Sequence, residues 1–367
     1  MKPYEPDSLP LDSIDWAAHV LLIGQANAAL ARYDGMLQSI VNPSVLLSPL
    51  TTQEAVLSSR IEGTQASMEE VLEYEADPSE KIESSKHADI QEIINYRRAM
   101  GMAVERLKKR PLCLNLIKEL HAALLDSVRG RNKAPGEFRR IQNFIGPPGC
   151  SIENASFVPP SPELLGPAMN NLEKYLHYDE KDPLVQLAVA KAQFEIIHPF
   201  LDGNGRMGRM LIPLFLYTKG LLSSPMFYLS AYLEEHREIY YQRLQSVSQN
   251  GDWNGWISFF LGAIVKQAEV NTKKTRDILA LYERMKEKVP TIVRSRYSIQ
   301  AIDALFSWPI FPVSGFVTRS KIPKDSARRI IAALRANAII EDVRPGRGRR
   351  AAILLFRELI SIARAGD

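Results

Sequence analysis

The sequence predicts a mainly α-helical protein that carries a small β-hairpin flap and ends in a winged helix-turn-helix. Apolar residues recur at three- and four-residue spacing through most of the first 290 positions, as amphipathic helices require. A stretch rich in glycine and proline, residues 130–162, interrupts that spacing. After Pro290, three short helical segments precede a Gly-Arg turn between two β-prone runs, and this order is typical of a winged helix.

The composition is that of a globular protein with room for two or three domains. The chain has 367 residues, of which 46% are hydrophobic and 24% charged, and its net charge of +4 is too small to argue for nucleic-acid binding. Cys113 and Cys150 have no CxxC spacing, which argues against a disulfide scaffold and a thiolate zinc site and indicates two free thiols. Because no signal sequence and no bilayer-spanning apolar run are found, we expect a cytoplasmic protein without membrane contact.

We expect three parts along the chain. Residues 1–105 form an N-terminal helical region, residues 106–275 a helical core, and residues 276–367 a connector helix with the winged-helix domain. Within the core, the β-prone runs QNFI and SFV are separated by turn-forming residues, which predicts a two-stranded flap.

The most informative stretch is HPFLDGNGRMGR, residues 198–209, which joins two predicted helices. Its glycines match the spacing GxGxxG and the glycine separation of a P-loop, but neither context is met. A helix rather than a strand comes before the stretch, and Arg209-Met210 stands where a P-loop has Lys-Ser/Thr.

A phosphate site accounts for every polar residue of this stretch. Backbone amides of a glycine-rich loop that leads into a helix bind anions, and Arg206 and Arg209, three residues apart, can both bond to phosphate oxygens. Asp202 offers a hard oxygen for Mg²⁺, and His198 can take up a proton near neutral pH. The alternative is a plain helix-loop-helix turn, which gives no reason for these residue types at these spacings.

The stretch resembles the signature of the Fic family, HxFx(D/E)GNGRxxR, at every specified position. The matching residues are His198, Phe200, Asp202, Gly203, Asn204, Gly205, Arg206 and Arg209. The resemblance covers roughly residues 40–265 and implies a Fic-type helical bundle. It also implies transfer of AMP from ATP to a Ser, Thr or Tyr hydroxyl of a target protein, or of the chain itself, with release of pyrophosphate.

The same resemblance implies a role for each residue. His198 is the general base, Phe200 anchors the loop in the core, and Asp202 holds Mg²⁺ (or Mn²⁺) against the α- and β-phosphates. The nucleotide-binding residues are Gly203, Asn204, Gly205, Arg206, Met207, Gly208, Arg209, Tyr240 and Tyr241. Among them, Asn204 and the loop amides form the anion hole at the α-phosphate, and the two arginines bind the β- and γ-phosphates.

A second motif lies upstream. Ser58, Glu62 and Gly63 match (S/T)xxxE(G/N), the inhibitory motif of many Fic proteins. Glu62 is expected to pair with Arg209 and to place a carboxylate where the γ-phosphate belongs. We therefore predict that Glu62→Gly raises transferase activity and that His198→Ala abolishes it. A role for Glu62 in removing AMP from the target stays open.

Two further regions follow from the resemblance. The flap is expected to register the target by main-chain pairing, with Ile145, Gly146, Phe157 and Val158 on its inner face. An ordinary surface hairpin is the alternative. Tyr240 and Tyr241 match a tyrosine pair that borders the adenine, and because adjacent helical residues diverge by about 100°, one should face the nucleotide while the other packs or points outward.

The C-terminal domain concentrates positive charge. Seven arginines of the predicted recognition helix and wing form a basic patch: Arg328, Arg329, Arg335, Arg344, Arg347, Arg349 and Arg350. DNA or RNA binding, protein docking and homodimer formation all stay open for this domain. The rival reading of the whole chain is a DNA-binding transcriptional regulator with a nucleotide-sensing Fic core, and a third is transfer of a different phosphoryl-containing group.

Overall fold

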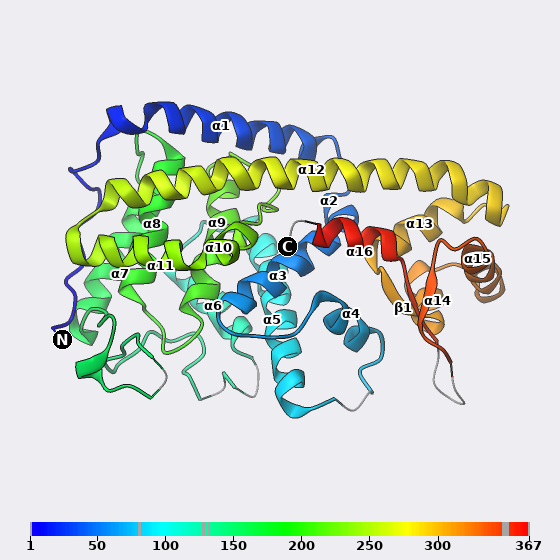
Figure 1. Cartoon of the computed structure of the whole chain (residues 1–367), viewed down its shortest axis with the longest axis horizontal. Helices are drawn as coiled ribbons and strands as arrows, with labels where there is room; N and C mark the ends of the chain where they lie inside the picture. Colours follow the sequence, from blue (N-terminus) through cyan, green and yellow to red (C-terminus); the bar gives the residue numbers. More distant parts are fainter. Residues whose placement is uncertain are drawn as a thin grey trace.

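The computed structural model describes residues 2–79, 82–126, 129–130, 132–147, 149–346 and 352–365. The chain is mainly helical, with one small sheet near the C-terminus, and it forms an elongated molecule (Figure 1). No helix within the described ranges combines the length and the apolar character that crossing a membrane would require. Both cysteines, Cys113 and Cys150, are free.

Most of the helices belong to the part before residue 300. Their bounds are α1 Trp16–Gln38, α2 Pro43–Leu46, α3 Ser48–Ile61, α4 Met68–Ala76, α5 Ser84–Leu107, α6 Leu114–Leu124, α7 Pro162–Leu176, α8 Pro183–Ile197, α9 Asn204–Thr218, α10 Ser230–Glu235, α11 Arg237–Asn250 and α12 Trp253–Val293, with a short 3-10 turn η1 at Ile152–Asn154. The predicted mainly helical fold is confirmed.

Helix α8 lies at the centre of the core. It begins with Pro183 at its first position, and the side chain of Asp182 accepts hydrogen bonds from the amides of Leu184 and Val185 at 2.9 and 3.0 Å. Nearly every residue of α8 is buried, because α1, α7, α9, α11 and α12 pack around it. Its C-terminal end is therefore a firmly held base for the residues that follow.

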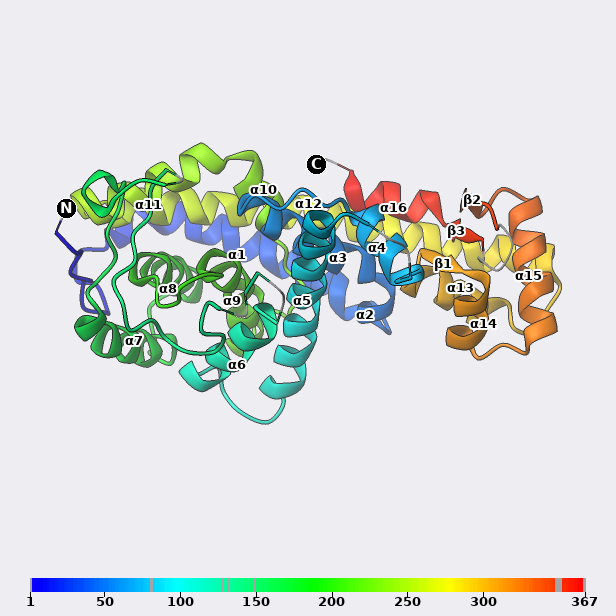
Figure 2. The ribbon, with the colours of Figure 1, turned by 90° about the horizontal axis from the view of Figure 1, so that it is seen from below.

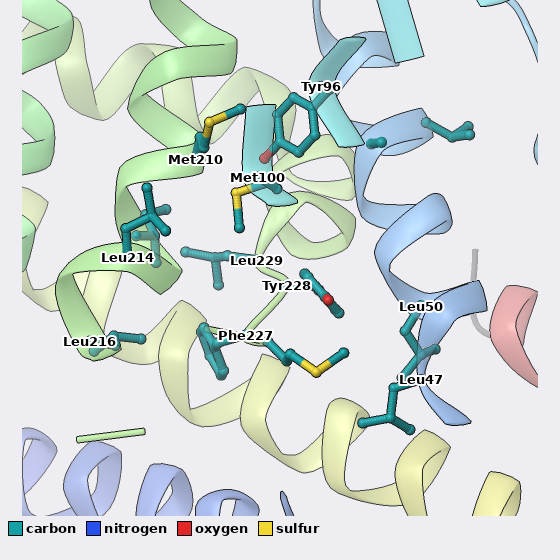
Figure 3. Close-up of a cluster of buried hydrophobic side chains, with 14 of the residues drawn as sticks. Leu47, Leu50, Tyr96, Met100, Met210, Leu214, Leu216, Phe227, Tyr228 and Leu229 are labelled. Carbon is teal, nitrogen blue, oxygen red and sulfur yellow. The ribbon is translucent and has the colours of Figure 1, made fainter. Parts of the chain in front are cut away.

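The apolar core also joins α3 and α5 to α9. Leu50 from α3, Tyr96 and Met100 from α5, and Met210 and Leu214 from α9 are among its buried side chains, with Tyr228 and Leu229 between Leu50 and the α9 residues (Figure 3). The five side chains from these helices are all buried, and each contributes roughly 1.5–3 kcal/mol through burial of apolar surface. The N-terminal helices are thus packed directly on the helix that begins with the signature glycines.

Helix α12 crosses the boundary that we expected at residue 275. It runs without a break over 41 residues, with α1 alongside it (Figure 1), and it continues three residues past Pro290, where we expected it to end. The predicted domain limits therefore fall within a continuous helix and stay predictions.

The C-terminal part alternates helices with short strands. Its elements are α13 Ser298–Ser307, β1 Ile310–Pro312, α14 Val313–Ser320, α15 Lys324–Ala336, β2 Glu341–Arg344, β3 Ile353–Leu355 and α16 Arg357–Arg364. The sheet order is β1-β3-β2 and all pairs are antiparallel. The expected three helices and hairpin are present, while β1 and α16 were not foreseen. The assignment as a winged helix stays a prediction, and the wing arginines Arg347, Arg349 and Arg350 lie outside the described residues.

This C-terminal part lies at one end of the molecule, with α7 and α8 toward the other and α3 and α5 between them (Figure 2). Helix α16 packs against α3 and α12. Lys274 Nζ on α12 donates to the carbonyl of Ala363 at 2.8 Å, and Arg344 forms an ion pair with Asp77. The C-terminal part is therefore in contact with the helices that precede the core.

The flap differs from the prediction. The two β-prone runs meet in one isolated antiparallel bridge, Ile145 with Phe157, in place of a two-stranded hairpin. Ile145 N donates to Phe157 O at 2.8 Å and Phe157 N donates to Ile145 O at 3.0 Å. The long insertion between the two runs contains the turn η1, and it separates the two segments after this single pair. Val158 is buried and Gly146 is exposed, so the four predicted residues do not share one face.

Candidate active site

The loop between α8 and α9 reverses the chain within six residues. His198 ends α8 in the left-handed region, with φ 50° and ψ 60°, and its amide donates to Phe194 O at 3.1 Å. Gly203 precedes α9 with φ 78°. A left-handed histidine is strained, and such a conformation persists where surrounding contacts enforce it. The loop accordingly shows several such contacts.

Asn204 and His121 hold the loop in shape. The Asn204 side chain accepts from Phe200 N at 2.8 Å and donates to Phe200 O at 2.9 Å, which closes the turn. His121 stacks on the Phe200 ring at 3.6 Å between centroids. Since His121 Nδ1 accepts from Gly136 N, its Nε2 carries the proton and donates to Asp202 O at 2.9 Å. Burial lowers the pKa of His121 to about 4, so the ring stays neutral.

His198 is arranged to accept a proton. Its Nδ1 lies 3.2 Å from the carbonyl of Glu195, and because a carbonyl can only accept, Nδ1 carries the hydrogen. The lone pair is then on Nε2. Burial lowers the pKa of His198, with partial compensation from Glu195, so the imidazole is neutral near pH 7 and its Nε2 can accept a proton.

The three signature glycines serve two purposes. Gly203 adopts a positive φ that disfavours other residues. A Cβ on Gly205 would collide with the carboxylate of Glu62, and a Cβ on Gly208 would collide with that of Glu195. The last two glycines therefore allow two carboxylates to approach the backbone of α9.

Arg209 is held by α3. Its Nε donates to Ser58 Oγ at 2.9 Å, and its Nη2 donates to Ser58 O at 2.7 Å and to Glu62 Oε1 at 2.6 Å. Burial alone would lower the pKa of Arg209, but the Glu62 carboxylate outweighs it and the pKa is raised. Burial likewise acts to raise the pKa of Glu62, and Arg209 reverses this so that the pKa is lowered. Both groups are charged at neutral pH.

Arg206 is held by α5. Its Nη1 donates to Glu92 Oε2 at 2.9 Å, while Nη2 lies 3.5 Å from Asp202 Oδ1. Glu92 also accepts from Thr64 Oγ1 at 3.3 Å and lies 3.6 Å from Arg129 Nη1. Arg206 is almost completely buried, and its Nε is a buried donor with no hydrogen-bond partner among the residues that the structure describes.

Asp202 presents the carboxylate that we expected to bind a metal. Its side chain is 40% exposed, and Oδ1 accepts from Gly203 N at 2.5 Å. Within the described residues, no group of three His, Cys, Asp or Glu side chains could hold an ion by itself. One accessible carboxylate fits Mg²⁺ that arrives with a nucleotide, because Mg²⁺ in such sites takes one or two carboxylates and the substrate phosphates.

The two tyrosines have different environments. Tyr240 is buried, and its hydroxyl lies 2.8 Å from Lys191 Nζ and 3.4 Å from Glu195 Oε1. Tyr241 is 43% exposed, with its ring 5.1 Å from that of Tyr240. Of the pair, Tyr241 is the one that a nucleotide can reach, and Tyr240 packs against the core.

Sequence reasoning did not identify His121, Glu92 or the buried Arg139 as part of this site. His121 could have been noticed, because it falls on the apolar face of LNLIKELHAALL with Ile117 and Leu124. No local pattern marks Glu92 or Arg139, since their bonds to Arg206 and to the carbonyl of His198 span 114 and 59 positions. The signature residues themselves lie close together, in the loop between α8 and α9 and in the first turns of α9.

Comparisons with known proteins agree with this arrangement. Residues 20–105 match the Fic/DOC family N-terminal model, and residues 111–216 match the Fic/DOC family model, together more than half of the chain. "Protein adenylyltransferase Fic" of Aedes aegypti is 30% identical over 192 residues, which are 49% of this chain and 34% of that protein. The protein of the same name from Drosophila grimshawi is 27% identical over 178 residues, 47% of this chain and 32% of that protein. The chain thus spans about one third of the length of these curated relatives.

Solved structures show the same fold. A Fic family protein from Desulfovibrio desulfuricans G20 aligns with a TM-score of 0.59 and 19% identity, over 97% of this chain and 98% of that chain. Fic-1 from C. elegans (residues 134–508) aligns with a TM-score of 0.53 and 19% identity, over 71% of this chain and 72% of that chain.

Proposed function

Because the chain belongs to the Fic/DOC family, we propose that it transfers AMP from ATP to a hydroxyl group of a protein. The observation that carries the proposal is the neutral His198 beside the start of α9. Its Nε2 is available for a proton, and the first amides of α9, at residues 204–206, have no acceptor within the helix. The name "Protein adenylyltransferase Fic" of the relatives supports the same activity.

The reaction follows from these groups. A Ser, Thr or Tyr hydroxyl oxygen attacks the α-phosphorus of ATP while His198 Nε2 takes its proton. The bond between the α-phosphorus and the bridging oxygen breaks, and pyrophosphate leaves with its electron pair. The α9 amides and Arg206 would stabilise the charge on the phosphates. Asp202 would hold Mg²⁺, which supplies charge neutralisation to the phosphates when it is bound.

Inhibition by α3 is part of the proposal. Glu62 places its carboxylate against Gly205, at the anion-binding end of α9, and it also binds Arg209 at 2.6 Å. A carboxylate in this position competes with a phosphate for the same donors. The protein would therefore bind or orient ATP poorly until Glu62 moves away.

A second proposal concerns the C-terminal part. Arg328 and Arg329 are exposed near the start of α15, which favours contact with the phosphates of a nucleic acid. Arg335, by contrast, forms an ion pair with Asp342. Under this proposal DNA affinity falls steeply with salt concentration and survives His198→Ala.

Labelled ATP tests the transferase proposal. Wild type, Glu62→Gly and Glu62→Gly/His198→Ala are incubated with Mg²⁺ and ATP labelled at the α- or γ-phosphate, with and without a protein extract as acceptor. We expect covalent label from the α-phosphate only, strongest in Glu62→Gly and lost with His198→Ala. Label from the γ-phosphate would make the protein a kinase, and no label in Glu62→Gly would contradict the proposal.

A further inference from the structure

Arg139 is a buried cation beside the signature loop, and the mechanism above does not use it. Only 3% of the residue is exposed. Its guanidinium donates to four carbonyl oxygens: His198 O at 2.9 Å, Pro160 O at 2.5 Å, Ile141 O at 3.3 Å and Ile197 O at 3.4 Å. Within the described residues it has no carboxylate partner. Its backbone amide also donates to Pro199 O at 2.9 Å.

A buried charge without a counter-charge is unfavourable unless other groups compensate it. Two of the carbonyls, those of Ile197 and His198, belong to the C-terminal end of α8, where the helix dipole is negative. Burial lowers the pKa of Arg139 to about 10, which leaves the side chain charged at neutral pH. Helix-end carbonyls thus take the place of a carboxylate here.

The contacts of Arg139 join two structures that are distant in sequence. Ile141 and Pro160 are the two stems of the flap, on either side of the bridge between Ile145 and Phe157. His198 is the base in its left-handed conformation. One side chain therefore fixes both stems of the flap to the backbone of the base.

We propose that Arg139 is a positioning residue that holds His198 in its strained conformation and couples it to the flap. The inference rests on the proposed transferase function for its consequence in catalysis. A target chain that pairs with the flap would then be registered directly against the base. Lysine cannot replace arginine in this role, because a single ammonium cannot reach carbonyls in three directions.

Asn143 adds a weaker link of the same kind. Its Nδ2 donates to Phe200 O at 3.2 Å and to His198 O at 3.5 Å. The flap is thus attached to the loop through two side chains, of which Arg139 makes the larger number of bonds.

The charge of Arg139 affects the pKa of His198, and a purely structural role would leave that pKa unchanged. The charged groups around His198 are Glu195 from α8, Glu62 from α3 and Arg139. The two glutamates favour the imidazolium form, whereas Arg139 disfavours it. Removing the charge at position 139 should therefore raise the pKa of His198, and removing the charge of Glu195 should lower it.

The test compares Arg139→Gln, Arg139→Lys and the matched control Arg140→Gln in a Glu62→Gly background. Arg140 is the neighbouring residue, with a side chain that is 86% exposed and paired with Glu137. Transfer from α-labelled ATP should fall at least roughly tenfold in both Arg139 variants, as for a displaced base, and stay unchanged in the control. The His198 imidazole, assigned by its loss in His198→Ala, is titrated by NMR.

We expect the His198 pKa to rise in Arg139→Gln and to stay at the parental value in Arg139→Lys, while Glu195→Gln lowers it. An unchanged His198 titration in Arg139→Gln, or parental transfer by Arg139→Lys, would overturn the proposal. If no variant transfers AMP, the proposed function fails, but the NMR titration still decides the role of Arg139.

Amide hydrogen exchange provides a second test, which does not require that either Arg139 variant folds. Asn143→Ala should speed hydrogen exchange at Ile145 N and Phe157 N, the two amides of the flap bridge, and slow transfer in the Glu62→Gly background. Unchanged exchange together with unchanged transfer would show that the flap and His198 are independent.

Discussion

The two arginines at the start of α9 are both bound by carboxylates from the N-terminal helices, but the two carboxylates are held differently. Glu62 stands at the last turn of α3, next to Gly63 at φ 99°, and its side chain is 35% exposed. Glu92 lies within α5 between Arg206, Arg129 and Thr64, with a side chain that is 12% exposed. Glu62 can therefore move away from Arg209 when the end of α3 unwinds by one turn. Glu92 lies within α5, is held by three partners and cannot move away from Arg206 in this way.

We infer from this difference which of the two contacts regulates the site. On α3 the residues Glu54, Ser58 and Glu62 are four positions apart and so form one stripe toward α9 and α10. Of the three, Glu62 is the one whose carboxylate lies against Gly205 at the start of α9. We infer that Glu62 controls access to α9 and that Glu92 is part of the permanent structure around Arg206.

The largest expected effect is that of Glu62→Gly. Releasing one charge-assisted pair of about 1.5–3 kcal/mol should raise the initial rate of AMP transfer roughly 10- to 100-fold. The measurement is the initial rate from α-labelled ATP, with Glu105→Ala on α5 as a control that removes only the exposed pair with Lys108. Equal rates for wild type and Glu62→Gly would show that Glu62 is not inhibitory.

Glu92→Gln should act in the opposite way. It leaves the buried Arg206 with the longer contact to Asp202 as its remaining ion pair, although the amide can still accept one hydrogen bond. We therefore expect a loss of about 2 kcal/mol in the free energy of unfolding. Transfer should not rise. Urea denaturation gives the free energy, and a faster transfer by Glu92→Gln would erase the distinction between the two arginines.

Glu54→Gln tests, by the pH dependence of stability, how α3 is held against α10. Glu54 accepts from Ser230 Oγ at 2.6 Å and from Tyr96 OH at 3.4 Å, and burial raises its pKa to about 7. A raised pKa means that the folded state binds the proton more tightly. Its contribution to stability is complete below pH 4.5 and is lost as the pH rises through about 7.

The variant should therefore have a free energy of unfolding about 3 kcal/mol higher than that of wild type at pH 8, and an equal one below pH 4.5. Thermal or urea unfolding at both pH values provides the comparison. A difference that does not change with pH would mean that Glu54 does not titrate in this window.

The smallest expected effect is that of Ser58→Ala. It removes Oγ as the acceptor for Arg209 Nε but leaves Ser58 O and Glu62 in place. We expect a gain of a few-fold in transfer, the equivalent of about 1 kcal/mol, and no further gain when it is combined with Glu62→Gly. A gain as large as that of Glu62→Gly would make the hydroxyl, and not the carboxylate, the main restraint on Arg209.

The sequence was sufficient for most of the helices and for the residues that meet at the signature loop. The reason is that loop geometry and anion binding depend on neighbours in sequence: Gly203, Asn204 and Phe200 shape the turn among themselves. The pairing of Arg209 with Glu62 spans 147 positions and was predicted only through the inhibitory motif, and the bonds from Arg209 to Ser58 were not predicted.

The flap and the supports of the loop could not be predicted in the same way. A hairpin requires two runs to stay in register, and the insertion between Ile145 and Phe157 leaves one bridge. Arg139 and Glu92 bond to the signature loop and to α9 across 59 and 114 positions, which no local spacing reveals. Strand β1 has three residues and gains its pairing only from β3, far along the chain.

The most direct test of the central claim compares the affinities of ATP and ADP. If Glu62 occupies the place of the γ-phosphate, the preference for ATP over ADP, measured by calorimetry with Mg²⁺ in a His198→Ala background, should increase roughly tenfold or more when Glu62→Gly is added. If the ratio of the affinities for ATP and ADP is the same with and without the Glu62 carboxylate, this carboxylate does not stand where the terminal phosphate binds.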